Sequence, residues 1–107
     1  MITEQQVQTA LDWMITNEDE MAKRKADYHD LDRFSKTIKA ELMSKVSSNM
    51  SVSAREIEAL ANEEYKTHLD NLREAEQRFL QYEYKMDHNK MICQLWQTIS
   101  ANKRQSV

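Results

Sequence analysis

The 107-residue sequence contains no glycine and no proline. At their average usage of about 7% and 5%, roughly a dozen of the two together would be expected. Glycine gives the backbone the conformations that tight strand hairpins, phosphate-binding loops and nucleophile elbows require. Its absence excludes the glycine-rich nucleotide-binding motifs and argues against sheet-based folds. The sequence therefore predicts an all-α protein.

Cysteine and long apolar runs are also scarce. A chain whose only cysteine is Cys93 cannot form an internal disulfide. No apolar run approaches the roughly twenty residues that cross a membrane. Residues 1–20 carry five acidic and no basic side chains, unlike the basic start of a secretory signal. We therefore expect a cytoplasmic protein without a membrane segment, folded as a single helical domain over residues 1–107.

An apolar repeat of seven residues runs through the first half of the chain. Its members are Val7, Met14, Met21, Tyr28 and Leu42, with Ala10, Leu31 and Ile38 at companion positions. Although Ser35 interrupts the series, this spacing predicts one helix over residues 3–46. Thr3 and Gln6 form a capping box at its start. The polar residues around Asn17 could instead cap a new helix, so a break there that gives a third helix remains an alternative.

Polar residues separate this helix from the second half of the chain. Residues 47–51 are Ser-Ser-Asn-Met-Ser, whose side chains mostly compete for backbone hydrogen bonds and disfavour helix. They predict a turn over residues 47–52. Ser53 and Glu56 form a second capping box, which predicts that a helix starts at Ser53.

The second predicted helix has its own seven-residue repeat. Its members are Tyr65, Leu72, Phe79, Met86 and Cys93, with Ala61, Ala75, Tyr82 and Trp96 at companion positions. The repeat predicts an unbroken helix over residues 53–101, followed by a tail over residues 102–107. At its start, Val52 is expected to pack against Ile57 across the cap.

The distribution of charge predicts that the two helices pair antiparallel, as a hairpin with the spacing of a coiled coil. Residues 21–46 carry seven bases against four acids, whereas residues 54–84 carry eight acids against four bases. Folding at the turn brings these oppositely charged blocks together. The same register pairs Leu42 with Ile57.

Three histidines are candidates for acid–base or metal chemistry: His29, His68 and His88. Glu64 and His68 lie four residues apart, and the hairpin brings Asp32 near them. Because the paired Glu-x-x-His motifs of helical di-metal sites are missing, a structural or exposed histidine is the better interpretation. Cys93 lies among apolar positions, where a small hydrophobic cysteine is ordinary. We therefore expect no catalytic residue, no metal and no cofactor.

A second apolar stripe lies off the main repeat of the second helix. It consists of Leu80, Tyr84, Met91, Leu95 and Ile99, and we call it the second stripe. Together with Trp13 and Trp96 it predicts a contact with another copy or another protein. We expect a homodimer, because burying each large apolar side chain contributes roughly 1.5–3 kcal/mol. The alternatives are scattered surface hydrophobes, a first helix that folds back over the stripe, and a surface kept free for a target.

Basic residues offer a weaker interpretation. Residues 23–25 are Lys-Arg-Lys, and the chain nears its end with Lys103 and Arg104. These bases are interleaved with acids and lack an aromatic stacking platform. Nucleic-acid binding is therefore an alternative that we do not favour.

Two segments resemble small uncharacterised helical early proteins of tailed phages and prophages. The first is Ser53–Glu56 with Glu58–Leu60 and Tyr65, and the second is Leu95–Gln97 with Ser100–Arg104. The resemblance implies an accessory role in recombination or against host defences, in the cytoplasm of the host cell and without a known active site. We expect a non-enzymatic protein-interaction module, an accessory or inhibitor protein, or alternatively a nucleic-acid-binding accessory of phage replication or recombination.

Overall fold

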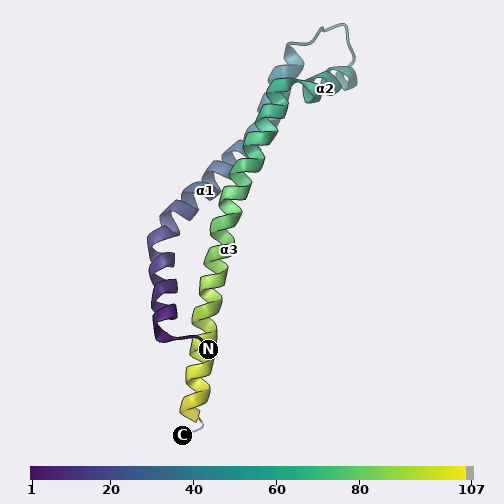
Figure 1. The fold of residues 1–107 in the computed structure, drawn as a ribbon. Helices are drawn as coiled ribbons and strands as arrows, with labels where there is room; N and C mark the ends of the chain where they lie inside the picture. The colour runs from purple at the N-terminus through teal and green to yellow at the C-terminus, as the bar shows by residue number, and fades with distance from the viewer. Residues whose placement is uncertain (106–107) are drawn as a thin grey trace. The chain divides into compact units, whose positions relative to one another are not determined.

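The computed structural model describes residues 1–105. They form three α-helices: α1 (Glu4–Ser44), α2 (Val52–Ala61) and α3 (Glu63–Gln105). The long helices α1 and α3 run antiparallel and pack against each other as a hairpin (Figure 1). No strand is present among residues 1–105. The prediction of an all-α helical hairpin is confirmed.

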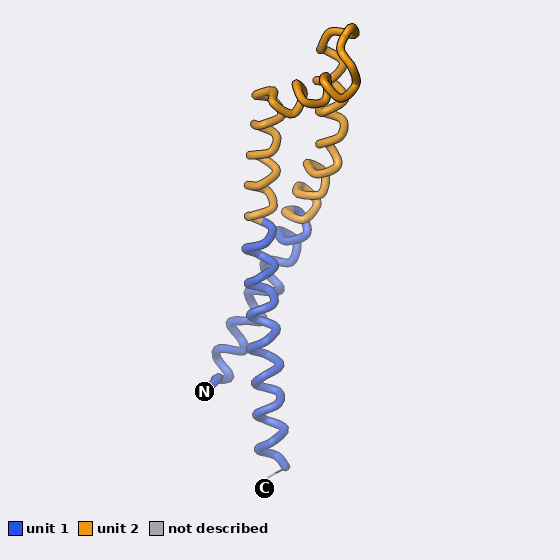
Figure 2. Tube along the Cα trace, turned by 90° about the vertical axis from the view of Figure 1, so that its right-hand side faces the viewer, with its two compact units in different colours: residues 1–23, 79–107 blue, residues 24–78 orange. Residues whose placement is uncertain are grey.

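The chain divides into two compact units, which Figure 2 distinguishes by colour. Unit 1 combines residues 1–23 with the chain from Phe79 onward, and unit 2 consists of residues 24–78. Each unit therefore contains one segment of α1 and one segment of α3. Unit 2 also contains α2 and the turn.

The start of α1 confirms the predicted capping box. The Thr3 amide donates to Gln6 Oε1 at 2.8 Å, and the Gln6 amide donates to Thr3 Oγ1 at 3.2 Å. The helix continues through Asn17, whose Nδ2 donates to the Trp13 carbonyl oxygen at 2.9 Å. The alternative of a break near Asn17, with a first helix folded back over the second stripe, is therefore wrong.

The start of α2 corrects the predicted cap. Ser51, and not Ser53, is the N-cap residue, because its side chain accepts a hydrogen bond from the Ala54 amide at 3.1 Å. Glu56 does not close a capping box with Ser53, since its carboxylate accepts from Lys39 Nζ on α1 at 3.0 Å. A cross-helix ion pair thus takes the place of the local contact.

Ile57 departs from both contacts predicted for it. Its side chain is 68% exposed, so it neither pairs with Leu42 nor forms a covered contact with Val52. The residue of α2 that is buried is Ala59. The physical reason is that α2 is a separate helix and need not continue the face of α3.

The cap assignment gives a testable prediction. Ser51→Ala should lower the free energy of unfolding by about 1 kcal/mol, because an early amide of α2 loses its acceptor. Ser53→Ala is the matched control and should change it by less than about 0.5 kcal/mol, as an exposed substitution. Urea unfolding followed by circular dichroism measures both. Equal losses from the two variants would contradict the assignment.

The predicted helix over residues 53–101 is in fact two helices. They are divided at Asn62, whose backbone is extended at φ −68° and ψ 141°. Asn62 Oδ1 accepts from the Glu64 amide at 2.8 Å, as an N-cap side chain does. Acidic Glu63 and Glu64 in the first turn of α3 favour a helix start there.

The end of α3 also differs from the prediction. The helix continues to Gln105, so residues 102–105 belong to it and not to a tail. Lys103 and Arg104 lie in this last turn, where positive charge interacts favourably with the helix dipole. The rest of the predicted tail, residues 106–107, lies outside the described residues.

The interface between α1 and α3 follows the predicted seven-residue repeats. The main repeat positions of both helices are buried or half-buried, including Ser35, whereas the predicted companion position Ala61 ends α2 and is exposed. The buried apolar residues are Ala10, Leu42, Ala59, Phe79 and Met86. No described large side chain is fully buried. The hairpin therefore has a narrow core with few layers.

Candidate interaction surface

The second stripe lies on the face of α3 that points away from α1. At 100° per residue, its members fall on the side of the helix opposite Phe79, Met86 and Cys93. Those three residues are buried or half-buried at the interface. The whole stripe belongs to unit 1. It is therefore an outer face that α1 does not cover.

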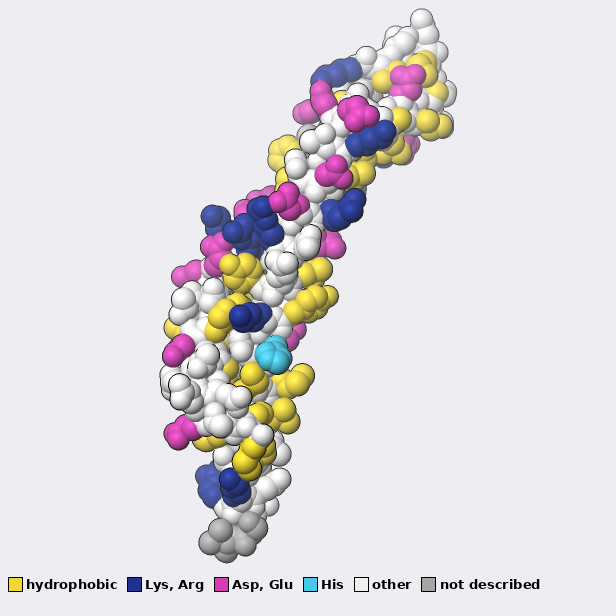
Figure 3. Space-filling view, in the orientation of Figure 1, with side chains coloured by type: hydrophobic (Ala, Val, Ile, Leu, Met, Phe, Trp, Pro, Cys, Tyr) yellow, Lys and Arg dark blue, Asp and Glu magenta, His cyan; other side chains and the backbone are white. Residues whose placement is uncertain are grey.

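Three members of the second stripe are well exposed. Tyr84, Met91 and Leu95 are exposed by 64%, 56% and 48% of their surface. Leu80 and Ile99, at its two ends, are half-buried. In Figure 3, hydrophobic side chains gather along the outer edge of the C-terminal half of α3. Large apolar residues in a row of this kind are typical of a contact surface.

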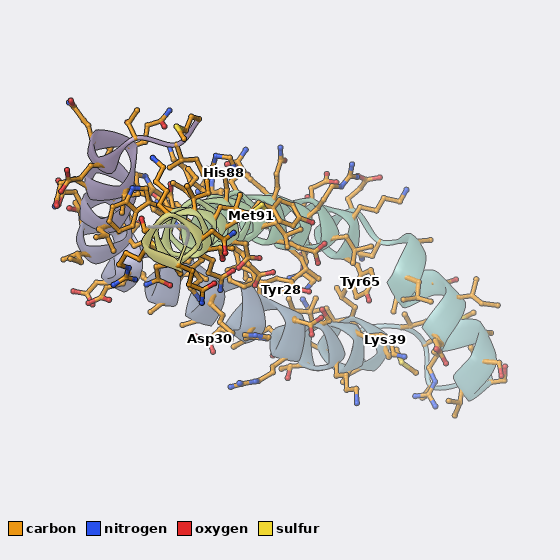
Figure 4. The ribbon with its side chains drawn as sticks, turned by 90° about the horizontal axis from the view of Figure 1, so that it is seen from below. Tyr28, Asp30, Lys39, Tyr65, His88 and Met91 are labelled. Atoms are coloured by element: carbon orange, nitrogen blue, oxygen red, sulfur yellow. The ribbon has the colours of Figure 1, made fainter. Side chains whose placement is uncertain are left out.

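The centre of this face carries no lysine, arginine, aspartate or glutamate. At spacings of three and four residues from Leu80, it presents Leu80, Tyr84, His88, Met91, Leu95, Thr98 and Asn102. His88 is exposed in the middle of the row and points outward from α3 in Figure 4. Ordinary solvent-facing helix surfaces carry charges and polar groups. The face around the second stripe, in contrast, carries no charged side chain at its centre over about six helical turns.

The two tryptophans lie elsewhere. The Trp13 ring on α1 packs against Tyr82 on α3 with a centroid distance of 6.1 Å. Lys85 Nζ lies 5.3 Å from the Trp13 ring centroid, within cation–π range. Trp96 is half-buried at the interface repeat. The structure thus places Trp13 between α1 and α3 and Trp96 half-buried on the interface repeat of α3, so neither lies on the second stripe.

A polar pair lies inside unit 2. Ser35 Oγ and His68 Nε2 are 2.8 Å apart across the interface, and His68 is only 6% exposed. Ser35 therefore does not simply interrupt the repeat, because a histidine faces it. The Tyr65 ring lies 6.2 Å from the His68 ring. This supports the interpretation of His68 as a structural residue.

This pair lacks the other parts of a catalytic site. A serine nucleophile needs a base that a third group orients and donors for an oxyanion. Among the described residues, the His68 ring has one polar partner, Ser35. Within residues 1–105, no three His, Cys, Asp or Glu side chains lie close enough to hold a metal ion. The geometry fits a buried hydrogen bond that fixes the register of the helices.

Sequence reasoning missed Asn89 as an interface residue. It is 6% exposed, and its Nδ2 has no hydrogen-bond partner among the described residues. The sequence does contain a signal for Asn89. Positions 61, 68, 75, 82, 89 and 96 are each seven residues apart, and they form one companion series of the repeat. His68 and Asn89 are the two polar members of that series. A repeat that is defined by apolar residues alone does not include either of them.

Four exposed bases of unit 2 have acidic partners on the same helix. Arg33 pairs with Asp30, Lys66 with Glu63, Arg73 with Asp70 and Arg78 with Glu74. An open groove of about 460 Å³ mixes Arg24 and Arg78 with three carboxylates. Such alternation gives no continuous positive track for a phosphate backbone.

Tyr28 also faces a carboxylate in unit 2. Its side chain points into the space between α1 and α3 in Figure 4, whereas Asp30 points away from it. The hydrogen bond to Glu76 is the main cause that raises the pKa of Tyr28 above its ordinary value. Like the Ser35–His68 pair, this contact joins the two helices. It adds no reactive group.

Comparisons with protein-family models, curated proteins and solved structures found no match to this chain. Among the described residues, no helix is long and apolar enough to cross a membrane.

Proposed function

We propose that the protein is a non-enzymatic protein-interaction module: a homodimer that binds a host or phage protein through its helical surfaces. The observation that carries this proposal is the exposed, charge-free face of α3 around the second stripe. A resemblance of residues 53–104 to small helical phage proteins supports an accessory or inhibitory role in the host cytoplasm. The Ser35–His68 and Tyr28–Glu76 contacts join the two long helices and do not suggest a catalytic function.

A large apolar face is costly to leave in water, so its presence on a well-formed helix favours a protein partner. Three large side chains, Tyr84, Met91 and Leu95, project from one face. A partner that covers them removes apolar surface from water at about 25 cal/mol per Å². Aromatic and methionine side chains are also enriched at the centres of protein interfaces.

Binding to nucleic acid is the less supported function. The salt bridges of Arg33, Arg73 and Arg78 occupy these cations with neighbouring carboxylates. Tyr82 and Trp13 pack against each other at a tilt of 31°. These rings contribute to the α1–α3 contact, and sequence-tolerant nucleic-acid binders instead present a row of free aromatic faces.

An affinity capture experiment tests the proposed function. The tagged protein should retain one dominant protein from a lysate of the bacterial host, with or without nuclease treatment. Leu95→Glu should reduce the captured amount at least tenfold, because it places a charge within the apolar face. Leu69→Glu, at a 43% exposed leucine elsewhere on α3, is the matched control and should leave capture unchanged.

Two results would contradict the proposal. Capture that disappears after nuclease treatment would favour the nucleic-acid alternative. Equal capture by the wild-type chain and Leu95→Glu would show that the second stripe is not the binding surface. Circular dichroism of each variant ensures that a loss of capture is not a loss of fold.

A further inference from the structure

We infer that two copies of the chain pair antiparallel through the outer face of α3, about a two-fold axis that passes between Asp87 and His88. The inference rests on the proposed function and specifies its first partner, a second copy. It follows from the order of side chains along the second stripe and its flank. All of the residues concerned lie in unit 1.

Four of the five residues of the stripe are symmetric about that point, and Ile99 alone has no apolar equivalent, because its matching position is Glu76. Leu80 lies as far before the midpoint as Leu95 lies after it, and the same holds for Tyr84 and Met91. An antiparallel copy therefore places Leu80 opposite Leu95 of the second copy and Tyr84 opposite its Met91. Each contact occurs twice, as an isologous two-fold interface requires. A tyrosine ring against a methionine side chain is a favourable pairing.

The charged residues beside the stripe fit the same register. Glu83, Asp87 and Lys90 project from one flank of the apolar face, at 100° per residue. In the antiparallel pair, this flank meets the same flank of the second copy. Lys90 then lies between Glu83 and Asp87 of the other chain. Lys90 thus faces opposite charges on both sides of the axis, and the only like charges that meet are the two Asp87 carboxylates at the axis itself.

These three charges are available for such contacts. Within residues 1–105, neither Glu83, Asp87 nor Lys90 forms a salt bridge or a side-chain hydrogen bond. Some other charged residues of the hairpin pair with a neighbour on their own helix, as Arg73 and Arg78 do. A parallel copy would instead set each stripe residue against itself, with Tyr84 on Tyr84 and His88 on His88. Self-complementarity of both size and charge thus selects the antiparallel copy.

His88 occupies a distinctive place in this arrangement. It is exposed, lies in the apolar row and has no charged neighbour across the centre of the face. The axis brings His88 of one copy beside His88 of the other. Position 88 is therefore the point of the stripe at which one residue contacts its own equivalent, which makes it the natural place for a test.

Thiol crosslinking tests the register. In a Cys93→Ala background, His88→Cys should crosslink to itself with a short bismaleimide and give a species with the mass of two chains. Leu95→Cys alone should not, because the two Leu95 positions are about 22 Å apart along the helices. An equimolar mixture of Leu95→Cys and Leu80→Cys chains should crosslink again. Denaturing electrophoresis and mass spectrometry give the readout.

Sedimentation equilibrium of the unsubstituted protein at micromolar concentration provides the second measurement. We expect the mass of two chains, at least tenfold weaker association for Leu95→Glu, and several-fold weaker association for Lys90→Glu. Adding Glu83→Lys and Asp87→Lys to Lys90→Glu should restore association, because the flank regains opposite charges. A folded single chain would overturn the inference. Crosslinking of Leu95→Cys with itself would overturn the antiparallel register.

The two proposals fail in different ways. If the protein is monomeric and Leu95→Glu still abolishes capture of a host protein, the inference and the homodimer of the proposed function fail, and the binding of a host protein through this face stands. If the crosslinking pattern appears and no host protein is captured, the second copy is the partner of this face and the target-binding proposal fails.

Discussion

Phe79→Ala is expected to lower the free energy of unfolding by about 3–5 kcal/mol. Phe79 is one of the few large apolar side chains that are nearly buried, and it begins the α3 segment of unit 1. Removing its ring from a narrow interface leaves a cavity that few neighbours can fill. Because domains of this size are stable by only about 5–15 kcal/mol in total, the variant should be partly unfolded near physiological temperature. Urea denaturation followed at 222 nm measures the loss.

Phe34→Ala is the matched control for this prediction. Phe34 has the same side chain on α1 and is 57% exposed. Its truncation should change the free energy of unfolding by less than about 0.5 kcal/mol. A comparable loss at both positions would show that the exposed faces of the hairpin are buried in solution by a contact not seen within one chain.

The second large effect is expected at the Ser35–His68 pair. Ser35→Ala removes the hydroxyl that lies 2.8 Å from His68 Nε2, leaving a buried ring nitrogen without its partner. The cost should be about 1–3 kcal/mol. Replacing both residues, as Ser35→Ala with His68→Leu, removes the unsatisfied group and should recover most of that loss. The two single variants and the double variant form a double-mutant cycle.

The sign of the coupling distinguishes the possible roles of the pair. A structural hydrogen bond predicts that the double variant is more stable than Ser35→Ala alone. Additive losses would mean that the two side chains contribute independently and that the short distance carries no stabilisation. Because the pair lies within unit 2, the second stripe should still capture its partner protein in all three variants.

The sequence predicted the helical hairpin and its interface, because both follow from the seven-residue apolar repeats. The absence of glycine and proline argues against the competing folds independently of the repeats. The continuity of α1 through Asn17 was harder to predict than the hairpin itself. A polar residue there can cap a new helix or bond to the preceding turn, and local sequence does not decide between the two. The packing of Trp13 against Tyr82 favours the continuous helix.

The same ambiguity explains the misplaced boundary in the second half. The repeat predicts an interior helix position at Asn62, yet its side chain caps α3 by accepting from the Glu64 amide. Ser51 and Ser53 both satisfy the local rules for a cap. In the structure Ser51 is the cap, and Glu56 forms an ion pair with Lys39, which lies 17 residues before Glu56 in the chain. Contacts at that separation are not visible in a local pattern.

The outer face of α3 was foreseen only in part. The second stripe was recognised because its residues fall outside the main repeat, and the structure leaves its central members exposed. Trp13 and Trp96 were grouped with it because large aromatic residues are common at protein contacts. Their positions away from the stripe depend on the rotation of each helix, which spacing alone does not fix.

The antiparallel connection of α1 and α3 also orders the events of folding. Lys39 and Glu56 are 17 residues apart, Ser35 and His68 are 33 apart, and Trp13 lies much farther from Tyr82. Closing the last contact directly from the unfolded chain costs about 1 kcal/mol more than closing the first, because the lost chain entropy grows with the logarithm of loop length. The hairpin is thus cheapest to assemble from the turn toward the chain ends. During synthesis, residues 1–23 leave the ribosome long before the segment from Phe79 onward, which completes their unit. Residues 1–23 are therefore synthesised well before the segment that they pack against, and they are expected to pack last.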